Sequence, residues 1–468
     1  MSNANASETN EKATNFFNAS NNKLFETNKN KSTIPHSMDV IADLHIHGRY
    51  SRATSKDLTI ANLEKYARIK GVNLLGTGDF THPKWSEELK KELIYSDGVL
   101  KTKTDFCFIP QTEISLVYTD YGKGRRVHHV ILAPDLEIAE QITEAFKKRG
   151  RVDYDGRPIF KITSPELVEM MHSISDKTEI IPAHVWTPWF GMLGSMSGFN
   201  SLKECFQEKA NKIHAIETGL SSDPAMNWRI SELDNRSILS FSDLHSFWPW
   251  RLGRECTIFD LKKINYDSIL QAIREQKVKE TIEFFPEEGK YHYDGHRNCG
   301  IVMSPKETKK AKGICPQCRK PMTLGVAYRV EELADREEGF KPVTAKPFKS
   351  LIPLSELISG GVGAGVASQK TWKVYNELQT IGNELHILLN ASHEEIKQIA
   401  GEKIAELVIM NRNQQIKITP GYDGEYGHPI FGNETKERKV TVKKTAEKET
   451  EKKEVKKQTP AQKSLGEF

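Results

Sequence analysis

Two histidines one residue apart end an apolar stretch near the start of the chain, in "IADLHIHGRYS". In an extended segment, side chains two residues apart lie on the same face, so His45 and His47 point the same way, with Asp43 beside them. Imidazole nitrogens are common metal ligands. The pair predicts a metal site if further ligands come from elsewhere in the chain. A pair of exposed surface histidines is the alternative.

Further imidazoles and carboxylates stand at or near the ends of later apolar runs. A single one has an ordinary explanation, such as a helix cap or a core histidine, but their recurrence at successive strand ends favours a shared site. Together they suit zinc, manganese or iron, and a bridging carboxylate such as Glu113 allows more than one ion. Sites with several ions clamp phosphoryl groups and activate water. The candidates are His45, His47, Asp79, Glu113, His128, His129, His184, Asp243 and His245.

The elements that must position these residues alternate between strands and helices. Predicted strands cover 39–47, 72–79, 106–118, 126–134, 179–186, 212–219 and 237–246, and predicted helices cover 59–71, 135–150 and 164–175. In the last helix we expect Ser164 as the N-cap and Pro165 at the first position. Repeated β–α alternation predicts an α/β barrel or wound sheet, in which functional residues gather at the carboxyl ends of the strands.

Composition limits the class of protein. The 468 residues suffice for two or three domains, and no apolar run of about 18 residues predicts a membrane span. The N-terminus lacks the basic and apolar segments of a secretion signal. Six cysteines are too few for a disulfide framework in a chain of this length, so we expect a reducing, cytoplasmic location.

The two ends differ from the rest of the chain. Residues 1–37 are rich in Asn, Ser, Thr and Lys, and residues 434–468 carry eleven Lys or Arg against seven Glu. Both are predicted to be disordered because they can bury little apolar surface. The tail accounts for the formal net charge of +4, so the body of the chain is near neutral. Any nucleic-acid-binding surface must therefore be local.

The order of the motifs resembles that of the polymerase and histidinol phosphatase (PHP) family over residues 38–285. The matching segments are "DLHIHGRYS", "TGDFTH", "TEIS", "HHVILA", "PAHVW" and "SDLHS". The resemblance implies a PHP-type distorted β/α barrel that hydrolyses phosphoesters with two or three divalent ions (Zn²⁺, Mg²⁺ or Mn²⁺). The ligands it implies are His45, His47, Glu113 and Asp243 for the first ion, Glu113, His184 and one of His128 and His129 for the second, and Asp79 and His245 for a third. Among these, Asp243, Glu113 and His184 are the predicted catalytic residues.

The sequence departs from the PHP pattern at the third ion. The usual Thr-Asp-His motif is replaced by "TGD", which ends in Asp79, and the positions where some relatives have another ligand are Ala53 and Thr54. The nearby His82 is a candidate to complete this site. Because adjacent strand residues face opposite sides, only one of His128 and His129 can point inward.

Three cysteines in the second half have the spacing of a zinc site. Cys299 precedes a Cys-x-x-Cys pair, Cys315 and Cys318, by sixteen residues, and His296 or His292 supplies a fourth ligand. Closed tetrahedral sites of this composition are structural. A redox pair is the alternative, but no thioredoxin-like pattern surrounds it. We therefore expect a zinc-binding module at 286–345, followed by a helical or mixed part at 346–433.

The longer phrases of the chain resemble the endonuclease Q family, DNA-repair enzymes of some archaea and a few bacteria. They are "GLSSDPAMNWR", "HSFWPWRLGRE", "RVEELADR" and "ITPGYDGEYGHPIFG". The resemblance implies nicking on the 5′ side of deaminated bases (uracil, hypoxanthine, xanthine) and abasic sites in damaged DNA. The alternatives are a small-molecule phosphatase like histidinol phosphatase and a non-catalytic DNA-binding scaffold.

Such an enzyme is expected to flip the damaged nucleotide out of the stack and to offset the cost by aromatic stacking. Rings that follow the predicted ligands are candidates for stacking, with core packing as the alternative. Small hydroxyl groups are candidates for reading the carbonyl left by deamination, and arginines for binding phosphates. The predicted contacts to the DNA or base are Trp186, Trp189, Phe190, Trp248, Ser221, Ser222, Arg49, Arg52 and Arg251.

The last seven residues, "QKSLGEF", suggest a protein partner. Gln462, Leu465 and Phe468 follow the spacing of peptides that dock on the sliding clamp PCNA as one helical turn. A clamp of this kind indicates an archaeal source and a nucleoid-associated protein.

Overall fold

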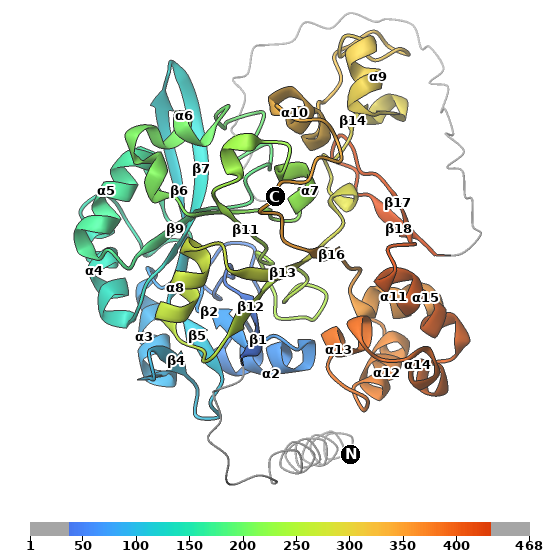
Figure 1. Cartoon of the computed structure of the whole chain (residues 1–468), viewed down its shortest axis with the longest axis horizontal. Coiled ribbons are helices and arrows are strands. Elements are labelled where there is room, and N and C mark those ends of the chain that lie inside the picture. Colours follow the sequence, from blue (N-terminus) through green and yellow to red (C-terminus); the bar gives the residue numbers. More distant parts are fainter. Residues whose placement is uncertain (1–36, 432–468) are drawn as a thin grey trace, which may run out of the picture. The chain divides into compact units, whose positions relative to one another are not determined.

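A computed structural model describes residues 37–431 of the chain (Figure 1). The two segments predicted to be disordered, apart from Ser37, and the proposed clamp-binding residues Gln462, Leu465 and Phe468 lie outside the described residues. Those predictions therefore stay predictions.

The first part of the chain is a distorted β/α barrel, as predicted. Its main sheet has eight strands in the order β16-β13-β12-β1-β2-β5-β4-β3, and a second sheet has the order β8-β6-β7-β9. The strands are β1 (Met38–Asp43), β2 (Leu74–Gly76), β3 (Ile94–Ser96), β4 (Val99–Lys101), β5 (Cys107–Ile109), β6 (Gln111–Asp120), β7 (Lys123–Leu132), β8 (Ile159–Phe160), β9 (Glu179–Pro182), β10 (Ala215–Glu217), β11 (Ser237–Leu239), β12 (Cys256–Leu261), β13 (Val278–Glu283) and β16 (Phe348–Ser350).

Hydrogen bonds join these sheets around the barrel. The Val185 N–H donates to the Glu217 carbonyl at 3.1 Å and so links the end of β9 to β10. Strands β10 and β11 pair in parallel, and the Ser240 N–H at the end of β11 donates to Thr257 Oγ1 of β12 at 3.0 Å. Parallel neighbours bring their carboxyl ends to one edge. The ligand residues that follow β1 and β11 therefore meet at one end of the barrel, where Ile46 and Leu244 form a parallel bridge. Glu113 and His128 instead come from within the antiparallel pair β6 and β7.

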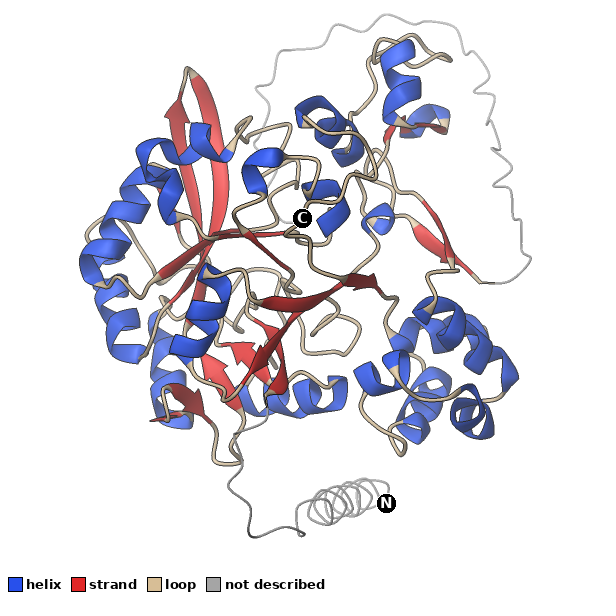
Figure 2. Ribbon diagram, viewed as in Figure 1, coloured by secondary structure: helices blue, strands red, loops and turns tan. Residues whose placement is uncertain are grey.

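Helices lie outside the strands of the barrel (Figure 2). Helix α2 (Ile60–Lys70) begins at Thr59 and ends at Gly71, whose φ of 99° is the left-handed conformation that favours glycine. Helix α5 differs from the prediction by one residue, because Thr163 is the N-cap and accepts from the Glu166 N–H. The other helices of the barrel are α3 (Pro83–Glu92), α4 (Leu136–Lys147), α5 (Ser164–Ile174), α6 (Leu202–Phe206), α7 (Pro224–Asn227) and α8 (Tyr266–Arg274).

The remaining elements form a small two-stranded module and a group of helices. The module contains β14 (Asp294–His296), β15 (Ile301–Met303), α9 (Pro305–Lys310) and α10 (Val326–Leu333). The later helices are α11 (Leu354–Val362), α12 (Gln369–Leu378), α13 (Glu384–Leu389), α14 (His393–Ala400) and α15 (Glu402–Arg412), followed by the hairpin β17 (Lys417–Thr419) and β18 (His428–Ile430). The predicted helical C-terminal part is confirmed.

The helical part shares a core with the barrel. Strand β16, at its start, pairs in parallel with β13, and one buried apolar cluster contains Ile258 and Ile282 of the barrel together with Leu357 and Leu385 of the helices. Burial of such side chains contributes roughly 1.5–3 kcal/mol each. The barrel and the α11–α15 helices are therefore stabilised together. Among residues 37–431, no helix combines the length and the apolarity needed to cross a lipid bilayer.

A buried carboxylate lies below the functional end of the barrel. Glu283, on β13, is completely buried and accepts hydrogen bonds from the hydroxyls of Thr218, Ser240 and Thr281. Burial, reinforced by the negative charge of Asp223, raises the pKa of Glu283 to about 8 despite these hydrogen bonds. Its carboxyl group is therefore protonated at neutral pH.

This proton makes stability depend on pH. Because the folded protein holds the proton more tightly than the unfolded chain, the stabilisation is complete below the ordinary glutamate pKa and is lost as pH rises through about 8. We expect Glu283→Gln, which mimics the neutral carboxyl, to lose less stability than the wild type between pH 5 and 8, by up to a few kcal/mol. Thermal unfolding of both proteins across this range measures the difference; parallel curves would contradict the assignment.

Candidate active site

One group of four side chains gathers at the carboxyl end of β1. His45 and His47 follow the strand, and their Nε2 atoms face the carboxylates of Glu113, from β6, and Asp243, which follows β11. His47 Nε2 lies 3.0 Å from Asp243 Oδ1 and 3.3 Å from Glu113 Oε2. For His45 Nε2 the same two distances are 3.6 and 3.7 Å. The four ligand atoms all lie within 4.8 Å of one another.

A second group shares Glu113 but uses its other carboxylate oxygen. Glu113 Oε1 lies 2.8 Å from His128 Nδ1 and 3.1 Å from His184 Nε2. The two imidazole nitrogens are 3.3 Å apart. Glu113 is fully buried between the two groups, with one oxygen directed to each. This is the arrangement of a carboxylate that bridges two ions.

The groups carry unpartnered atoms that fit bound cations. His45 Nε2, His47 Nε2 and Asp243 Oδ1 are buried and have no hydrogen-bond partner among residues 37–431. Burying polar atoms without partners is costly unless a ligand satisfies them. Imidazole and carboxylate donors suit zinc, manganese or iron. The residues present therefore fit the divalent ions that the sequence predicts.

Neighbouring side chains in the site shift the pKa values of its two carboxylates. Burial opposes ionisation of Glu113, but the surrounding imidazoles and the Arg157 guanidinium outweigh it and hold the pKa of Glu113 well below its usual range. Burial likewise opposes ionisation of Asp243, and His45 and His47 reverse the effect, so its pKa is also well below the usual value. Both carboxylates are therefore ionised at neutral pH.

Buried carboxylates behind the imidazoles fix their orientation. Glu217, at the end of β10, lies 2.8 Å from His45 Nδ1 and also accepts from the His184 N–H at 2.7 Å. Asp79 accepts from the Gly48 N–H and lies 3.0 Å from His47 Nδ1. A carboxylate on the far nitrogen of a ligating histidine fixes its tautomer and increases its basicity. Glu217 was missing from the sequence prediction, although it lies near the end of a predicted strand and ends β10 in the structure.

The structure does not assemble the third predicted metal site. The Asp79 carboxylate is engaged by His47, Gly48 and Ser51, and His245 Nδ1 is 3.8 Å from Asp243 Oδ1. Neither residue joins a group of three or more ligand atoms among residues 37–431. The Asp79 carboxylate therefore orients the His47 ring and does not join a ligand group among the described residues.

The two adjacent histidines of β7 face opposite sides, as strand alternation requires. His128 points into the second group, whereas His129 Nε2 lies 3.1 Å from Ser164 Oγ and its ring packs near Phe206. Burial lowers the pKa of His129 to about 3, so the ring is neutral. His129 is therefore a core residue, and of the two histidines that the sequence left open, His128 is the candidate ligand.

Several site residues have strained backbones. Asp79, His184 and Asp243 have φ values of 41°, 31° and 46°, in the left-handed region that non-glycine residues rarely adopt. Such conformations persist only where the surrounding structure imposes them, and they concentrate at functional sites. Close packing beside His184 requires a glycine at position 219, since a Cβ there would lie 2.3 Å from His184 Cβ.

Arg157 enters the site from the loop before β8, and no sequence signal predicted it. Its Nη1 lies 3.1 Å from Glu113 Oε2, and its side chain is 28% exposed. The guanidinium is therefore anchored at the bridging carboxylate yet accessible to solvent. A planar cation in this position can bind a phosphate through two parallel hydrogen bonds.

The predicted stacking rings differ in their surroundings. Phe190 stacks on the His128 ring with centroids 4.4 Å apart, and Arg126 lies over Trp189. Trp186 is fully buried and donates to Asn227 Oδ1 at 2.8 Å, so its prediction as a DNA contact is wrong. Trp248 stacks on Trp250 with an interplanar angle of 3°.

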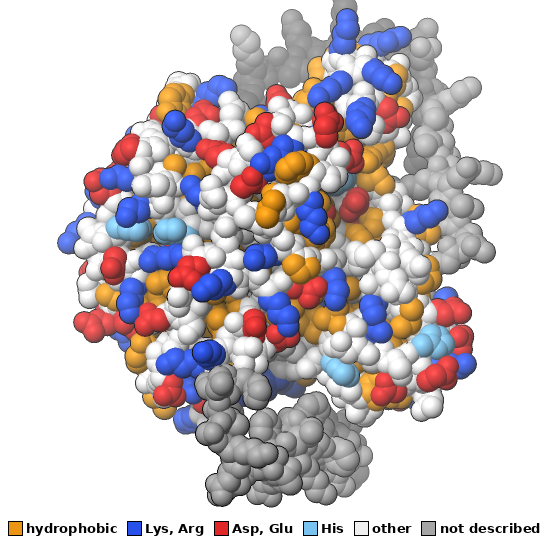
Figure 3. All heavy atoms as spheres, viewed as in Figure 1, with side chains coloured by type: hydrophobic (Ala, Val, Ile, Leu, Met, Phe, Trp, Pro, Cys, Tyr) orange, Lys and Arg blue, Asp and Glu red, His pale blue; other side chains and the backbone are white. Residues whose placement is uncertain are grey.

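The predicted polar contacts to the DNA or base also differ in burial and in their partners. Ser222 is buried and bonds to the Thr218 carbonyl and the Asn227 side chain, so it is structural rather than a base contact. Ser221 is half-buried and Arg251 is exposed. Arg49 pairs with Glu88 at 2.6 Å, whereas the mostly exposed Arg52 lies 3.5 Å from Asp155. On the face drawn in Figure 3, basic and acidic side chains are interspersed, which agrees with a near-neutral body.

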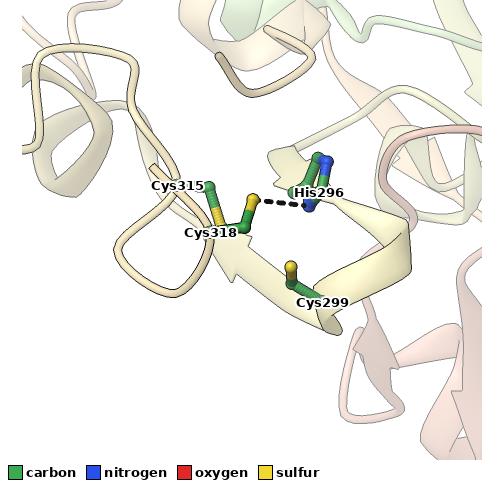
Figure 4. A group of neighbouring side chains, drawn as sticks. All are labelled: His296, Cys299, Cys315 and Cys318. Atoms are coloured by element: carbon green, nitrogen blue, oxygen red, sulfur yellow. Dashed lines mark hydrogen bonds between the residues drawn. The ribbon is translucent and has the colours of Figure 1, made fainter. Parts of the chain in front are cut away.

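The cysteine cluster forms a second candidate metal site, shown in Figure 4. Its ligand atoms lie within 4.8 Å of one another, and Cys318 Sγ is 3.6 Å from His296 Nδ1. His292 is buried outside the cluster, so His296 is the better fourth ligand of the two that were open. Three sulfurs and one imidazole fit a closed tetrahedral zinc site. The cluster residues are His296, Cys299, Cys315 and Cys318.

The barrel and its carboxylate-bridged centre define a metal-dependent phosphodiesterase of the PHP type. The crystal structure of the lesion-specific endonuclease PfuEndoQ from Pyrococcus furiosus is similar, with a TM-score of 0.76 and 31% identity over 88% of this chain and 100% of that one. An endonuclease Q complex with a 27-mer duplex containing an abasic lesion gives a TM-score of 0.75 and 31% identity, over 86% of this chain and 99% of that one. The chain belongs to the endonuclease Q family.

Two further comparisons concern parts of the chain. The uncharacterised protein MJ0043 of Methanocaldococcus jannaschii is 35% identical over 255 residues, which span 53% of this chain but only 31% of that protein. A family model described as the MJ0043 C-terminal domain matches residues 353–415. This segment contains helices α11–α15.

Replacing a cysteine tests the zinc assignment. We expect Cys318→Ser to remove about one equivalent of zinc per chain, because serine is a poor replacement for a thiolate ligand. Metal analysis of the purified full chain measures the loss. Cys107→Ser, at a buried cysteine outside the cluster, is the control and should retain the zinc. Equal zinc content in Cys318→Ser and the wild type would contradict the site.

Proposed function

We propose that this protein is a DNA-repair endonuclease that hydrolyses the phosphodiester on the 5′ side of a damaged nucleotide. The proposed lesions are abasic sites and the deaminated bases uracil, hypoxanthine and xanthine, and the proposed products are a 3′-hydroxyl and a 5′-phosphate. The observation that carries the proposal is the pair of ligand groups joined by Glu113. The likeness to lesion-specific endonucleases over nearly the whole chain supports it.

The ligand groups fit two divalent ions, which when bound would withdraw charge from a phosphoryl group and lower the pKa of water. His45, His47, Glu113 and Asp243 would hold one, and Glu113, His128 and His184 the other. Glu217 and Asp79 hold the far nitrogens of His45 and His47 and so fix the ring orientations before substrate arrives. This preorganisation avoids reorganisation during the reaction.

The residues around the ligand groups support binding of the substrate. Arg157 would bind the scissile phosphate, since its partly exposed guanidinium lies 3.1 Å from the Glu113 carboxylate. Phe190, stacked beside His128, and Trp189 offer aromatic faces for a flipped nucleotide. Stacking contributes roughly 1–3 kcal/mol per base, enough to offset much of the cost of unstacking. We further propose that the C-terminal Gln462, Leu465 and Phe468 dock on the PCNA clamp, on the strength of their spacing alone.

Nicking of a lesion-containing duplex tests the function. In the presence of Mn²⁺ or Mg²⁺, the protein should cut 5′ to uracil or an abasic site, and Asp243→Asn should slow cutting by at least about 100-fold, because it removes a charged ligand while keeping the size of the side chain. Asp97→Asn, at an exposed surface carboxylate, is the matched control.

Three results would count against this function. Equal cutting of undamaged DNA would reject lesion specificity. Full activity of Asp243→Asn would reject the site. Release of phosphate from a small monoester, with the oligonucleotide left intact, would instead favour a phosphatase.

Arg157 gives a separate prediction. Lysine keeps the charge but loses the planar fork, so we expect Arg157→Lys to lower the single-turnover nicking rate by about 10- to 100-fold, with little change in DNA affinity. Added guanidinium should partly restore Arg157→Ala. Arg151→Lys, in the same loop with an exposed side chain paired to Asp153, is the control. An unchanged rate in Arg157→Lys would exclude a bidentate contact to the phosphate.

A further inference from the structure

Asp243 belongs to a loop, residues 242–253, that we call the Asp243 loop. A single buried side chain closes the loop at its base, because Asp43 accepts from the Ser242 N–H through Oδ1 and from the Gly253 N–H through Oδ2, both at 3.0 Å. The two ends of the loop are therefore held together at the end of β1. Loops closed in this way are compact units that carry functional residues.

The first half of the Asp243 loop is fastened to the histidine segment. Leu244 forms a parallel bridge with Ile46, and the His47 N–H donates to the Leu244 carbonyl at 3.2 Å. The Ser55 N–H donates to the His245 carbonyl at 2.9 Å. These bonds set the distance between Asp243 and His47 on the side of the loop nearest to the ligand group.

The second half of the loop is held from the helical part of the chain. Trp248 and Trp250 stack in parallel, and the Trp372 ring of α12 lies 5.4 and 5.7 Å from their centroids. The carbonyl of Pro249, between the two tryptophans, accepts from Lys70 Nζ at 2.9 Å. Lys70 is the last residue of α2 in the barrel.

Lys70 is in turn paired with the helical part. Its Nζ lies 2.7 Å from Glu384 Oε1, at the start of α13, and the two side chains are 2% and 0% exposed. The Tyr375 hydroxyl of α12 donates to Glu384 Oε2 at 2.6 Å, and the Leu354 N–H of α11 donates to Oε1 at 3.1 Å. Three helices thus fix one buried carboxylate, which fixes the lysine that holds the loop.

We propose that the α11–α15 helices, the segment matched by the MJ0043 C-terminal domain model, position the barrel's metal centre by holding the Asp243 loop through the Lys70–Glu384 pair. Glu384, Lys70 and Trp372 are positioning residues. The buried Lys70 ammonium needs the Glu384 carboxylate to balance its charge. Its hydrogen bond to the Pro249 carbonyl connects this pair to the Asp243 loop.

The backbone of Asp243 explains why such support is needed. Its φ of 46° is strained for a non-glycine residue, so a loosened loop lets Asp243 relax away from His47. Replacing Glu384 by a neutral residue leaves the buried Lys70 ammonium without its carboxylate partner. It also weakens the hydrogen bond from Lys70 to the Pro249 carbonyl. The expected consequence is a mobile Asp243 loop with weaker binding of the cation between Asp243 and the histidines.

Glu384→Gln in the full chain tests this inference. Amide hydrogen exchange within residues 242–253 should accelerate, and the affinity for Mn²⁺, measured by electron paramagnetic resonance without DNA, should fall about 10-fold or more. The kcat for nicking should fall with little change in KM, and the zinc content should stay the same. Glu179→Gln is the matched control, because Glu179 is a buried carboxylate paired with His214 and Arg274 and bonds to no residue of the loop.

A second variant distinguishes a loosened Asp243 loop from general unfolding of the protein. Trp372→Leu, at a partly exposed ring, should accelerate exchange in the same loop while the thermal unfolding temperature remains close to that of Glu179→Gln. Unchanged exchange in the loop and unchanged Mn²⁺ affinity in both variants would overturn the inference. The kcat readout rests on the proposed function. If the wild type does not nick damaged DNA, that function fails, but exchange and Mn²⁺ affinity still decide the role of the helices.

Discussion

The buried carboxylate of Glu113 is the interaction on which the functional end of the barrel depends. One oxygen faces His45 and His47, and the other faces His128 and His184. A carboxylate removed from water is tolerated only where positive charge compensates it. Arg157 provides part of that charge, and the cations that the site fits would provide the rest when bound. The groups therefore form one electrostatic unit, in which each ligand depends on the others.

Residues outside the two ligand groups fix the positions of the ligand side chains. Glu217 and Asp79 orient the imidazoles, and Asp43 closes the loop that carries Asp243. Left-handed backbones at Asp79, His184 and Asp243 are maintained by these contacts. Rigid supports of this kind keep ligands at productive distances without movement during the reaction. The helices α11–α15, which share a core with the barrel strands, extend the support beyond the PHP barrel.

The sequence predicted the parts of the site that depend on strand periodicity and local order. Polar residues at strand ends identified Glu113, His184 and Asp243, and alternation required one of His128 and His129 to point away, although it did not say which. The fold class followed from the β–α alternation and the PHP-like motifs. The Cys-x-x-Cys spacing identified the cysteine cluster, but the choice between His296 and His292 depends on the three-dimensional structure.

The parts that escaped prediction depend on contacts between distant segments. Arg157 lies in an irregular loop with no motif, and its role is visible only because the fold brings it to Glu113. Asp79 resembled a ligand because its motif position normally holds one, yet its carboxylate reaches His47 instead. Trp186 follows a ligand in sequence but turns into the core. The Lys70–Glu384 pair joins residues 314 positions apart, beyond any local pattern.

The most direct test of the central claim is anomalous diffraction from crystals of the full chain grown with Mn²⁺. If one carboxylate bridges two ions, the maps will show one peak among His45, His47, Glu113 and Asp243 and another among Glu113, His128 and His184, with Glu113 contacting both. Peaks located elsewhere, or a barrel that binds no Mn²⁺ at concentrations that support catalysis, would contradict the account.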